Sequence, residues 1–373
     1  MLNIQEKFMI AKKEMAEALV DREAEIDMLF TAVLAKTNLL LIGPPGTGKS
    51  LLLDSFMRLI NGKKFSLLMT KFTTPEEVFG PISLKGLEND HYRRITTDRL
   101  PEAHVAFLDE IFKSNSAILN TLLKILNEGV FENDGVAHKV PLELCVAASN
   151  EKPDPETAKE LGALFDRFLL RKVVTPVRKT KDLEKLLWQR DHNPKFSISI
   201  SIEELTEARK LVSKVEWTKE AKECYLEIIK GLAKEGVCPG DRRKFRCVDV
   251  IQSWAWLNGK NQVTPDDFDI ACYVLWDDFG EQERICANII LEKAKPLRMA
   301  VADMLLEFDE IVSDIDKSDS TSLTRANKKL ESLIDKIEFM PANPKLEWLL
   351  AEIKKQKIEI KDAMTKLIVG KKK

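Results

Sequence analysis

The segment Gly43–Ser50 constrains the fold of this 373-residue chain most strongly, because its sequence, G-P-P-G-T-G-K-S, directly follows the apolar run Leu39–Ile42. It completes the pattern G-x-x-x-x-G-K-[ST] between a predicted strand and a predicted helix, the setting in which such a loop binds nucleotide phosphates. Glycines let consecutive backbone N–H groups face the phosphates, Lys49 reaches the β- and γ-phosphates, and the Ser50 hydroxyl ligates Mg²⁺. The four fixed positions coincide by chance in roughly one of a hundred chains of this length. The sequence therefore predicts a nucleotide phosphate site.

The apolar pattern around this loop predicts an α/β fold. Residues 50–61 have the pattern of a helix that ends before Gly62. Four later segments have the length and apolar character of buried strands: Phe65–Met69, Val105–Leu108, Leu142–Ser149 and Phe168–Val174. Strands separated by helices of this length indicate a central parallel sheet with helices on both faces.

Three domains are expected along the chain. Residues 1–178 form the nucleotide-binding core, residues 179–279, in which the apolar spacing becomes helical, form an all-α lid domain, and residues 280–373 form a C-terminal three-helix domain. In the last domain, one long helix is expected from Ile285 to Ile315 with a kink at Pro296. Short breaks at 317–322 and 341–344 separate it from two further helices, which suits a small bundle or a coiled-coil arm.

Composition excludes several classes of protein. Lysine and arginine number 58 against 60 aspartate and glutamate residues, so the chain lacks the basic field typical of proteins that bind duplex DNA. The six cysteines are scattered without metal-ligand spacing, which favours reduced thiols and a cytoplasmic location. No signal peptide is recognisable, and no run of eighteen apolar residues predicts a membrane span.

The pair Asp109-Glu110 supplies the second half of a predicted ATPase site. It ends the apolar run Val105–Leu108, sixty residues after Lys49. A carboxylate at the carboxyl end of such a strand can hold Mg²⁺ against the phosphates, so Asp109 is assigned to the metal, and Glu110 can polarise the attacking water. The alternative is an ordinary strand terminus.

Asn150 and Arg167 are the next candidates. Asn150 ends the strand Leu142–Ser149, where its amide can orient the water, although an asparagine there can also cap a turn. Arg167 lies between apolar residues, which would fix its guanidinium on a subunit surface, where it can neutralise charge on a phosphoryl group bound by a neighbour. The alternatives are an internal Asp166–Arg167 pair, or Arg171 in the same role.

The segment Gly240–Arg243 opens a predicted helix of the lid domain. An arginine there could fold back over the nucleotide and couple its state to the angle between the domains. Arg242 is preferred for this position and Arg243 is the rival; by spacing alone, either can also be a solvated helix start.

These segments together resemble an AAA+ ATPase, and within that superfamily the MoxR family, most closely its RavA-like branch. The resemblance covers about residues 15–278 and is carried by the following segments: Thr73–Pro81, Leu100–Ala103, Phe107–Ile111, Ala117–Leu123 and Ala147–Glu151.

The resemblance implies ATP and Mg²⁺ as cofactors, with Ser50 and Asp109 on the metal, Glu110 as the base-like residue, Asn150 as first sensor, Arg167 as trans finger and Arg242 as second sensor. The nucleotide-binding residues are then Val20, on the adenine side, followed by Gly43, Pro44, Pro45, Gly46, Thr47, Gly48, Lys49, Ser50 and Leu51. Two insertions, near 81–97 and as a hairpin at 129–141, are implied to face the pore of a ring. A homohexamer is implied that remodels, matures or assembles a protein complex with a partner containing a von Willebrand factor A domain; the sequence does not identify the substrate.

Other functions are weighed against this one. A nucleic-acid motor shares both insertions but should present lysine or arginine there, and here the charges nearly balance. A chelatase-like motor subunit has the same architecture, and a scaffold could bind nucleotide without hydrolysis. The chain also departs from RavA-like proteins, because its breaks at 317–322 and 341–344 are too short for their β-rich insert.

Overall fold

The computed structural model describes residues 3–151, 162–188, 194–278, 280–316, 319–338, 340 and 344–370. The chain forms two compact units, Met1–Ile290 and Leu291–Lys373. Residues 317–318 and 341–343, within the two predicted breaks, lie outside the described residues. The division of the first unit into a core and a lid at residue 178 stays a prediction.

A five-stranded sheet forms the centre of the first unit, in the order β3-β4-β7-β1-β8. All neighbouring strands in it pair in parallel. Their bounds are β1 (Leu39–Ile42), β3 (Lys64–Leu68), β4 (Val105–Asp109), β7 (Leu144–Ser149) and β8 (Leu170–Val173). The predicted α/β fold is confirmed, and every predicted strand is found to within two residues at each end.

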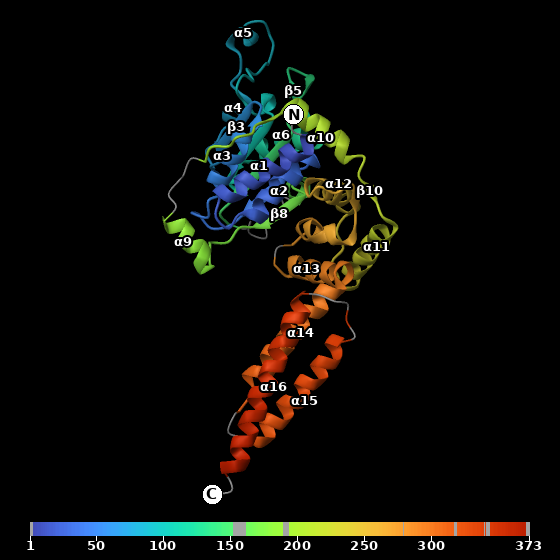
Figure 1. The fold of residues 1–373 in the computed structure, drawn as a ribbon. Helices are drawn as coiled ribbons and strands as arrows, with labels where there is room; N and C mark the ends of the chain where they lie inside the picture. The colour runs from blue at the N-terminus through green and yellow to red at the C-terminus, as the bar shows by residue number, and fades with distance from the viewer. Residues whose placement is uncertain are drawn as a thin grey trace. The chain divides into compact units, whose positions relative to one another are not determined.

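Helices lie around this sheet (Figure 1), and all but the last of them in the chain, residues 180–188, bury apolar side chains. Their bounds are α1 (Ile4–Ala18), α2 (Glu23–Leu34), α3 (Lys49–Leu59), α4 (Pro75–Phe79), α6 (Ser116–Glu128), α8 (Gly162–Arg167) and α9 (Thr180–Trp188), with short 3-10 turns η1 (Leu100–Glu102) and η2 (Ile111–Lys113). Leu40, Leu108 and Ala147 are fully buried in the core between them. Burying these strands on both faces fixes the sheet, and with it the positions of the loops at its carboxyl edge.

Both predicted insertions are present. The first carries the single turn α5 (Leu84–Leu87), is closed by a bridge between Ile82 and Arg94, and stands away from the sheet in Figure 1. The second is a hairpin of β5 (Val130–Asn133) and β6 (Val136–Lys139). Its tip, Asp134-Gly135, has positive φ at both residues, as a tight hairpin turn requires.

The rest of the first unit is mainly helical. It contains α10 (Ile202–Val212), α11 (Lys219–Lys234), α12 (Asp241–Leu257), the 3-10 helix η3 (Pro265–Tyr273) and most of α13 (Glu281–Ala294), which crosses the boundary after Ile290. Two small parallel pairs were not predicted: β2 (Ile60–Asn61) with β9 (Ile200–Ser201), and β10 (Glu216–Trp217) with β11 (Gln262–Val263). Strands of two residues are too short to show an alternating pattern in the sequence.

The second unit consists of α14 (Pro296–Ser313), α15 (Ser320–Glu338) and α16 (Pro344–Gly370), with its own apolar cluster. The expected single helix from Ile285 to Ile315 is wrong: α13 ends at Ala294 and α14 begins at Pro296. Proline lacks the N–H that would continue the ladder but suits the first turn of a new helix. Among the helices in the described parts of the chain, none is long and apolar enough to cross a membrane.

Candidate functional site: a phosphate loop and a separate arginine cluster

The phosphate loop follows the carboxyl end of β1 and leads into α3. A Cβ atom on Gly43 would lie 2.2 Å from the Val174 carbonyl oxygen, so only glycine fits there. Gly48 has φ +79°, and the space beside it is open. It is the N-cap of α3 and supplies no side-chain cap. The first N–H groups of the helix can therefore face an anion, which is the arrangement that a nucleotide phosphate needs.

Lys49 is held at the mouth of this loop. Its side chain is 7 % exposed, and its Nζ donates to three oxygens: Gly43 O at 2.6 Å, Pro44 O at 3.1 Å and Asn150 Oδ1 at 2.9 Å. Burial lowers the pKa of Lys49, while the nearby Asp109 and Glu110 carboxylates raise it. An anionic phosphate would favour the protonated, positively charged form of Lys49, as these carboxylates do. The residues present fit ATP at this position.

Asp109 and Glu110 lie at the end of β4, two strands away from β1 in the sheet. Burial raises the pKa of Asp109, and the Glu110 N–H donates to its Oδ1 at 3.0 Å. Glu110 has φ +55°, a conformation that non-glycine residues seldom adopt and that is common at functional sites. Glu110 as a whole is 4 % exposed, and its carboxylate lies 3.4 Å from Lys113 Nζ. Ser50, the other predicted metal ligand, is exposed in the first turn of α3.

Asn150 links these groups. Its Oδ1 accepts from Lys49 Nζ at 2.9 Å, and its Nδ2 donates to a Glu110 carboxylate oxygen. The structure thus brings Lys49, Asp109, Glu110 and Asn150 together at one edge of the sheet, as the sequence predicts.

Val20 lies one turn before α2, and its neighbour Arg22 contacts the phosphate loop directly. Arg22 is buried and donates to the carbonyl oxygens of Thr47 at 3.1 Å and Thr175 at 3.2 Å. The segment that holds Val20 is therefore beside the loop. Sequence reasoning missed Arg22, because no local pattern distinguishes a buried arginine from a solvated one. The available signal was its place two residues after Val20, the residue assigned to the adenine side.

Arg167 lies at the opposite edge of the sheet. Asn38, the residue before β1, donates to the Arg167 carbonyl oxygen at 3.2 Å, which places Arg167 at the amino edge. Its side chain pairs with Asp166 at 2.6 Å, the internal contact left open by the sequence. Arg167 is thus remote from the Lys49 of its own chain.

Arg171, the alternative to Arg167 for contacting a neighbour's phosphoryl group, is an internal residue instead. It is buried and donates to four carbonyl oxygens, those of Phe165, Phe168, Trp276 and Asp277. Its guanidinium also lies 5.4 Å and 5.6 Å from the rings of Phe165 and Trp276. Arg171 therefore joins β8 to the segment that follows η3.

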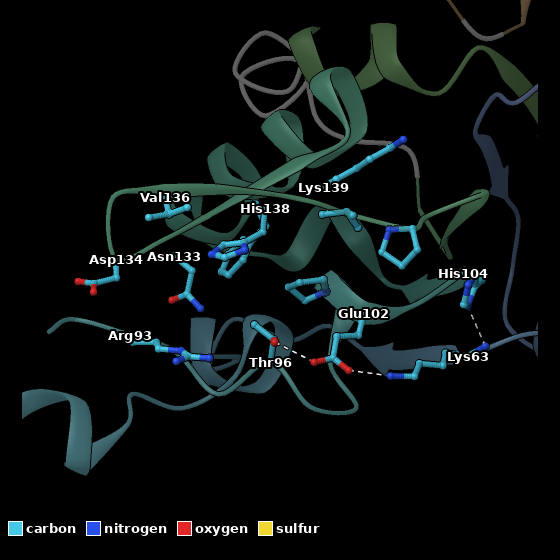
Figure 2. A pocket seen from close by; sticks show the side chains of 14 residues that line it. Lys63, Arg93, Thr96, Glu102, His104, Asn133, Asp134, Val136, His138 and Lys139 are labelled. Atoms are coloured by element: carbon cyan, nitrogen blue, oxygen red, sulfur yellow. Dashed lines mark hydrogen bonds and ion pairs between the residues drawn. The ribbon is translucent and has the colours of Figure 1, made fainter.

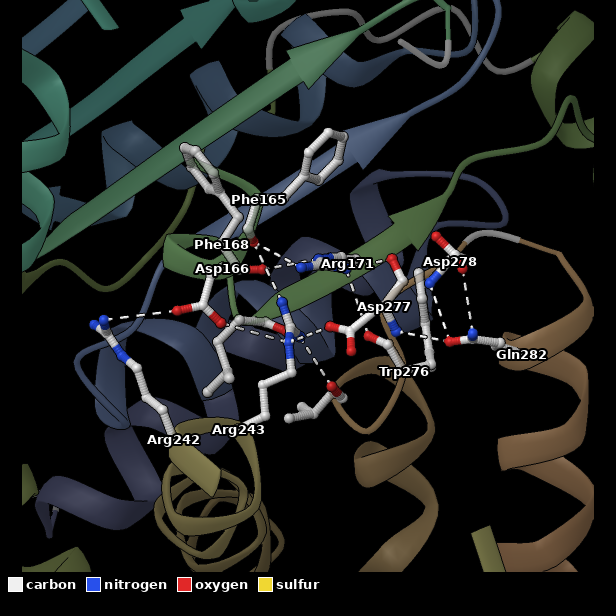
Figure 3. Close-up of polar contacts among 12 residues, drawn as sticks. Phe165, Asp166, Phe168, Arg171, Arg242, Arg243, Trp276, Asp277, Asp278 and Gln282 are labelled. Carbon is white, nitrogen blue, oxygen red and sulfur yellow. Dashed lines mark hydrogen bonds and ion pairs between the residues drawn. The ribbon is translucent and has the colours of Figure 1, made fainter. Parts of the chain in front are cut away.

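Arg243 is equally internal. It is 1 % exposed and donates to the carbonyl oxygens of Phe165, Leu169 and Val274, while its Nε lies 3.0 Å from an Asp277 carboxylate oxygen (Figure 3). Burial lowers the pKa of Arg243, and Asp277 opposes this. A residue enclosed in this way cannot reach a nucleotide, so Arg243 is excluded as the second sensor.

Arg242 points to the surface that carries Arg167, not to the phosphate loop. Its Nη1 lies 3.1 Å from Asn127 Oδ1 and 3.8 Å from Asp166 Oδ2. One turn on in α12, Arg246 donates to the carbonyl oxygens of Ala35 and Lys36, which precede β1. The start of α12 is therefore at the amino edge of the sheet. The expectation that Arg242 folds back over the nucleotide of its own chain disagrees with these contacts.

An open cavity of about 590 Å³ lies between the two insertions and is also lined by Lys63 and by Pro101, Glu102 and His104 (Figure 2). Its wall carries charges of both signs, and its acidic residues are already bonded: Glu102 accepts from Lys63 at 2.8 Å and Thr96 at 2.9 Å, and Asp134 pairs with His91. Arg94 pairs with Glu76 outside the cavity. Arg93 and Lys139 also line the cavity and have no acidic partner among the described residues, so only part of the charge in its wall is paired.

Comparison with known protein families gives two matches. Residues 6–210 match the model described as the MoxR domain in the MoxR-vWA-beta-propeller ternary systems. Residues 222–290 match an AAA lid domain.

Some similar proteins match this chain over nearly its whole length, and others match only part of it. Two uncharacterized proteins of Methanocaldococcus jannaschii are 32 % and 34 % identical over 100 % and 97 % of this chain and 93 % and 92 % of their own. The chaperone MoxR1 of Mycobacterium tuberculosis is 25 % identical over 42 % of this chain and 41 % of its own. A crystal structure of a proposed ATPase from Cytophaga hutchinsonii has a TM-score of 0.62 at 18 % identity and covers 78 % of this chain and 94 % of that one, a likeness in fold.

Proposed function

The chain belongs to the MoxR family of AAA+ ATPases, and we propose that it hydrolyses ATP in a homohexameric ring whose sites are completed by neighbouring subunits. The RavA-like branch is a finer assignment that stays a prediction. The observation that carries the proposal is the bridge made by Asn150 between Lys49 and Glu110. It joins the residue that contacts phosphate to the residue that activates water.

Each residue of the bridge then has a chemical task. Lys49 and the first N–H groups of α3 would bind the β- and γ-phosphates, and Ser50 with Asp109 would hold Mg²⁺, which neutralises charge on those phosphates. Glu110 would accept a hydrogen bond from a water placed in line with the terminal phosphate and so polarise that water. Asn150 orients the Glu110 carboxylate through its Nδ2 and is itself held by Lys49, whose Nζ donates to its Oδ1.

The trans half of the site would come from the surface that carries Arg167 and Arg242. These guanidinium groups are at the edge of the sheet opposite Lys49, so neither can serve its own chain's phosphates in this arrangement. A ring brings the opposite edges of neighbouring subunits together. Arg167 would neutralise charge on the transferring phosphoryl group of the neighbour, and we assign Arg242 to the same side.

The work done by hydrolysis would be the remodelling or maturation of a protein complex. The matched family is described by systems that also contain a von Willebrand factor A protein and a beta-propeller protein, so a von Willebrand factor A protein is the partner we propose. The chain as a whole has no excess of lysine and arginine, with 58 against 60 acidic residues, which favours a protein substrate over a nucleic acid.

Two substitutions and their mixture test this function. Glu110→Gln should retain ATP binding and lose turnover, and Arg167→Ala should lower turnover by about a thousandfold with little change in affinity. When the two variants are co-assembled, turnover should return, because a Glu110→Gln subunit supplies an intact Arg167 to its neighbour. ATP affinity is measured by calorimetry and turnover by phosphate release.

Lys219→Ala, which removes an exposed charge from α11, is the control and should leave turnover unchanged. Full turnover in the Glu110→Gln protein would falsify the assigned mechanism, and no recovery in the mixture would exclude the trans arrangement. Strong stimulation by DNA, with none by a von Willebrand factor A protein, would favour a nucleic-acid motor instead.

A further inference from the structure

Three arginines lie beside the single carboxylate of Asp166, and Figure 3 shows two of them, Arg242 and Arg243. Arg167 Nη1 lies 2.6 Å from Asp166 Oδ2, and Arg242 Nη1 lies 3.8 Å from the same oxygen. Arg243 Nε lies 3.8 Å from Oδ1. The first arginine comes from α8 of the sheet domain, and the other two come from the start of α12. One acidic side chain therefore stands where two parts of the first unit meet.

Arg167 depends on Asp166 for its position. It is the last residue of α8, and its Nε is buried with no hydrogen-bond partner among the described residues. Within that same part of the chain, the ion pair with Asp166 is the polar contact that fixes its guanidinium. A buried donor without a partner costs free energy, which favours a move to a new acceptor. In Arg167, Nη1 is held by Asp166 while Nε lacks an acceptor.

Arg242 needs the same carboxylate for another reason. Burial and the neighbouring Arg167 both lower the pKa of Arg242, and Asp166 raises it. Two guanidinium groups of like charge repel each other on a shared surface unless an acid lies between them.

We propose that Asp166 is a positioning residue that holds Arg167 and Arg242 together on the surface that completes the ATP site of a neighbouring subunit. This inference rests on the proposed trans arrangement. Asp166 contacts no nucleotide itself; it sets the direction of two cations that do. When Arg167 turns toward the neighbour's phosphates, the carboxylate keeps Arg242 as its partner, so the direction of Arg242 is retained.

A purely structural role for Asp166 is less consistent with the contacts. Its side chain is 39 % exposed, and the buried Arg243 has a closer partner in Asp277, at 3.0 Å instead of 3.8 Å. Arg243 also donates to three carbonyl oxygens. Attachment of α12 to α8 and Leu169 therefore does not require Asp166, and Asp277→Asn is a matched control that removes a carboxylate from the same cluster.

The test compares Asp166→Asn, Asp166→Glu and Asp277→Asn in the full chain. Asp166→Asn should lower turnover about tenfold or more and change ATP affinity by about twofold at most, because its own phosphate loop is intact. Asp166→Glu keeps the charge and should recover part of the loss. Asp277→Asn should stay within about twofold of the unmodified protein in turnover.

Co-assembly supplies a result that a folding defect would not produce. Asp166→Asn subunits keep their own catalytic residues, and Glu110→Gln subunits keep the arginine surface, so mixed rings should turn over faster than either parent. Recovery with Arg167→Ala but not with Asp166→Asn would overturn the role of Asp166 and leave the trans finger in place. Wild-type turnover in Asp166→Asn would also overturn it. Failure of both mixtures would overturn the trans arrangement itself.

Discussion

Asn150 contacts a cation and an anion at the same time, and both contacts are short enough to order the side chains involved. Lys49 has two further carbonyl acceptors, Gly43 and Pro44, but Glu110 has only Lys113 as another side-chain partner among the described residues. Loss of the Asn150 amide should therefore disturb Glu110 more than Lys49.

We predict that Asn150→Ala lowers turnover by about a hundredfold, the usual scale for misplacing a group that assists proton transfer, while ATP affinity changes little. Single-turnover phosphate release and calorimetry separate the two quantities. Asn261→Ala, an exposed asparagine outside the site, is the control. A large loss of affinity with normal turnover would mean that Asn150 acts through Lys49 instead.

The residues at the phosphate edge could be predicted because each ends a strand or a loop of a parallel sheet. Lys49, Glu110 and Asn150 follow β1, β4 and β7, and the carboxyl ends of parallel strands meet at one edge. Arg242 could not be placed in this way. Its position depends on how α12 packs against α2 and η3, and no local sequence pattern predicts that packing.

At the scale of elements, two buried arginines hold β8 and α12 to the segment after η3. Arg171 extends from β8 to the carbonyl oxygens after η3, and Arg243 extends from α12 to the carbonyl oxygens of α8 and the segment after η3. Both sit in apolar surroundings, where sequence patterning predicts aliphatic side chains. A buried arginine is tolerated only when its donors are satisfied, and here backbone carbonyl groups satisfy them.

Neighbouring arginines should therefore respond differently to substitution. Arg243→Met should lower the free energy of unfolding by about 3 kcal/mol, because Asp277 and several buried carbonyl oxygens lose their partner. Arg242→Met should leave the melting temperature nearly unchanged and lower turnover. Chemical denaturation and phosphate release measure the two effects. Equal loss of stability in both variants would contradict the distinct placement of the two side chains.

At the scale of the whole molecule, each of the two units has its own buried apolar cluster. In the second unit the cluster joins α14, α15 and α16, and it includes Leu333, Leu349 and Ile353, all fully buried. The sequence predicted these helices from apolar spacing, but it could not show that a break at Pro296 separates α14 from α13. Whether the chain breaks there or continues as one helix depends on how well each of the two helices packs against the rest of the protein. Such packing is a tertiary effect that apolar spacing does not show.

Separate cores predict separate unfolding. Leu349→Ala should remove about 3 kcal/mol from the second unit, the usual cost of a cavity at a fully buried leucine, and should leave ATP binding unchanged. Calorimetric scans should then show an earlier transition for Leu291–Lys373 alone, and hydrogen exchange should quicken in α14, α15 and α16 but not in β1 or β4. Lys354→Ala, on the exposed face of α16, is the control. If both units melted together, or if ATP affinity fell in parallel, their stabilities would be coupled, and the second unit would have to be counted as part of the machinery that responds to the nucleotide.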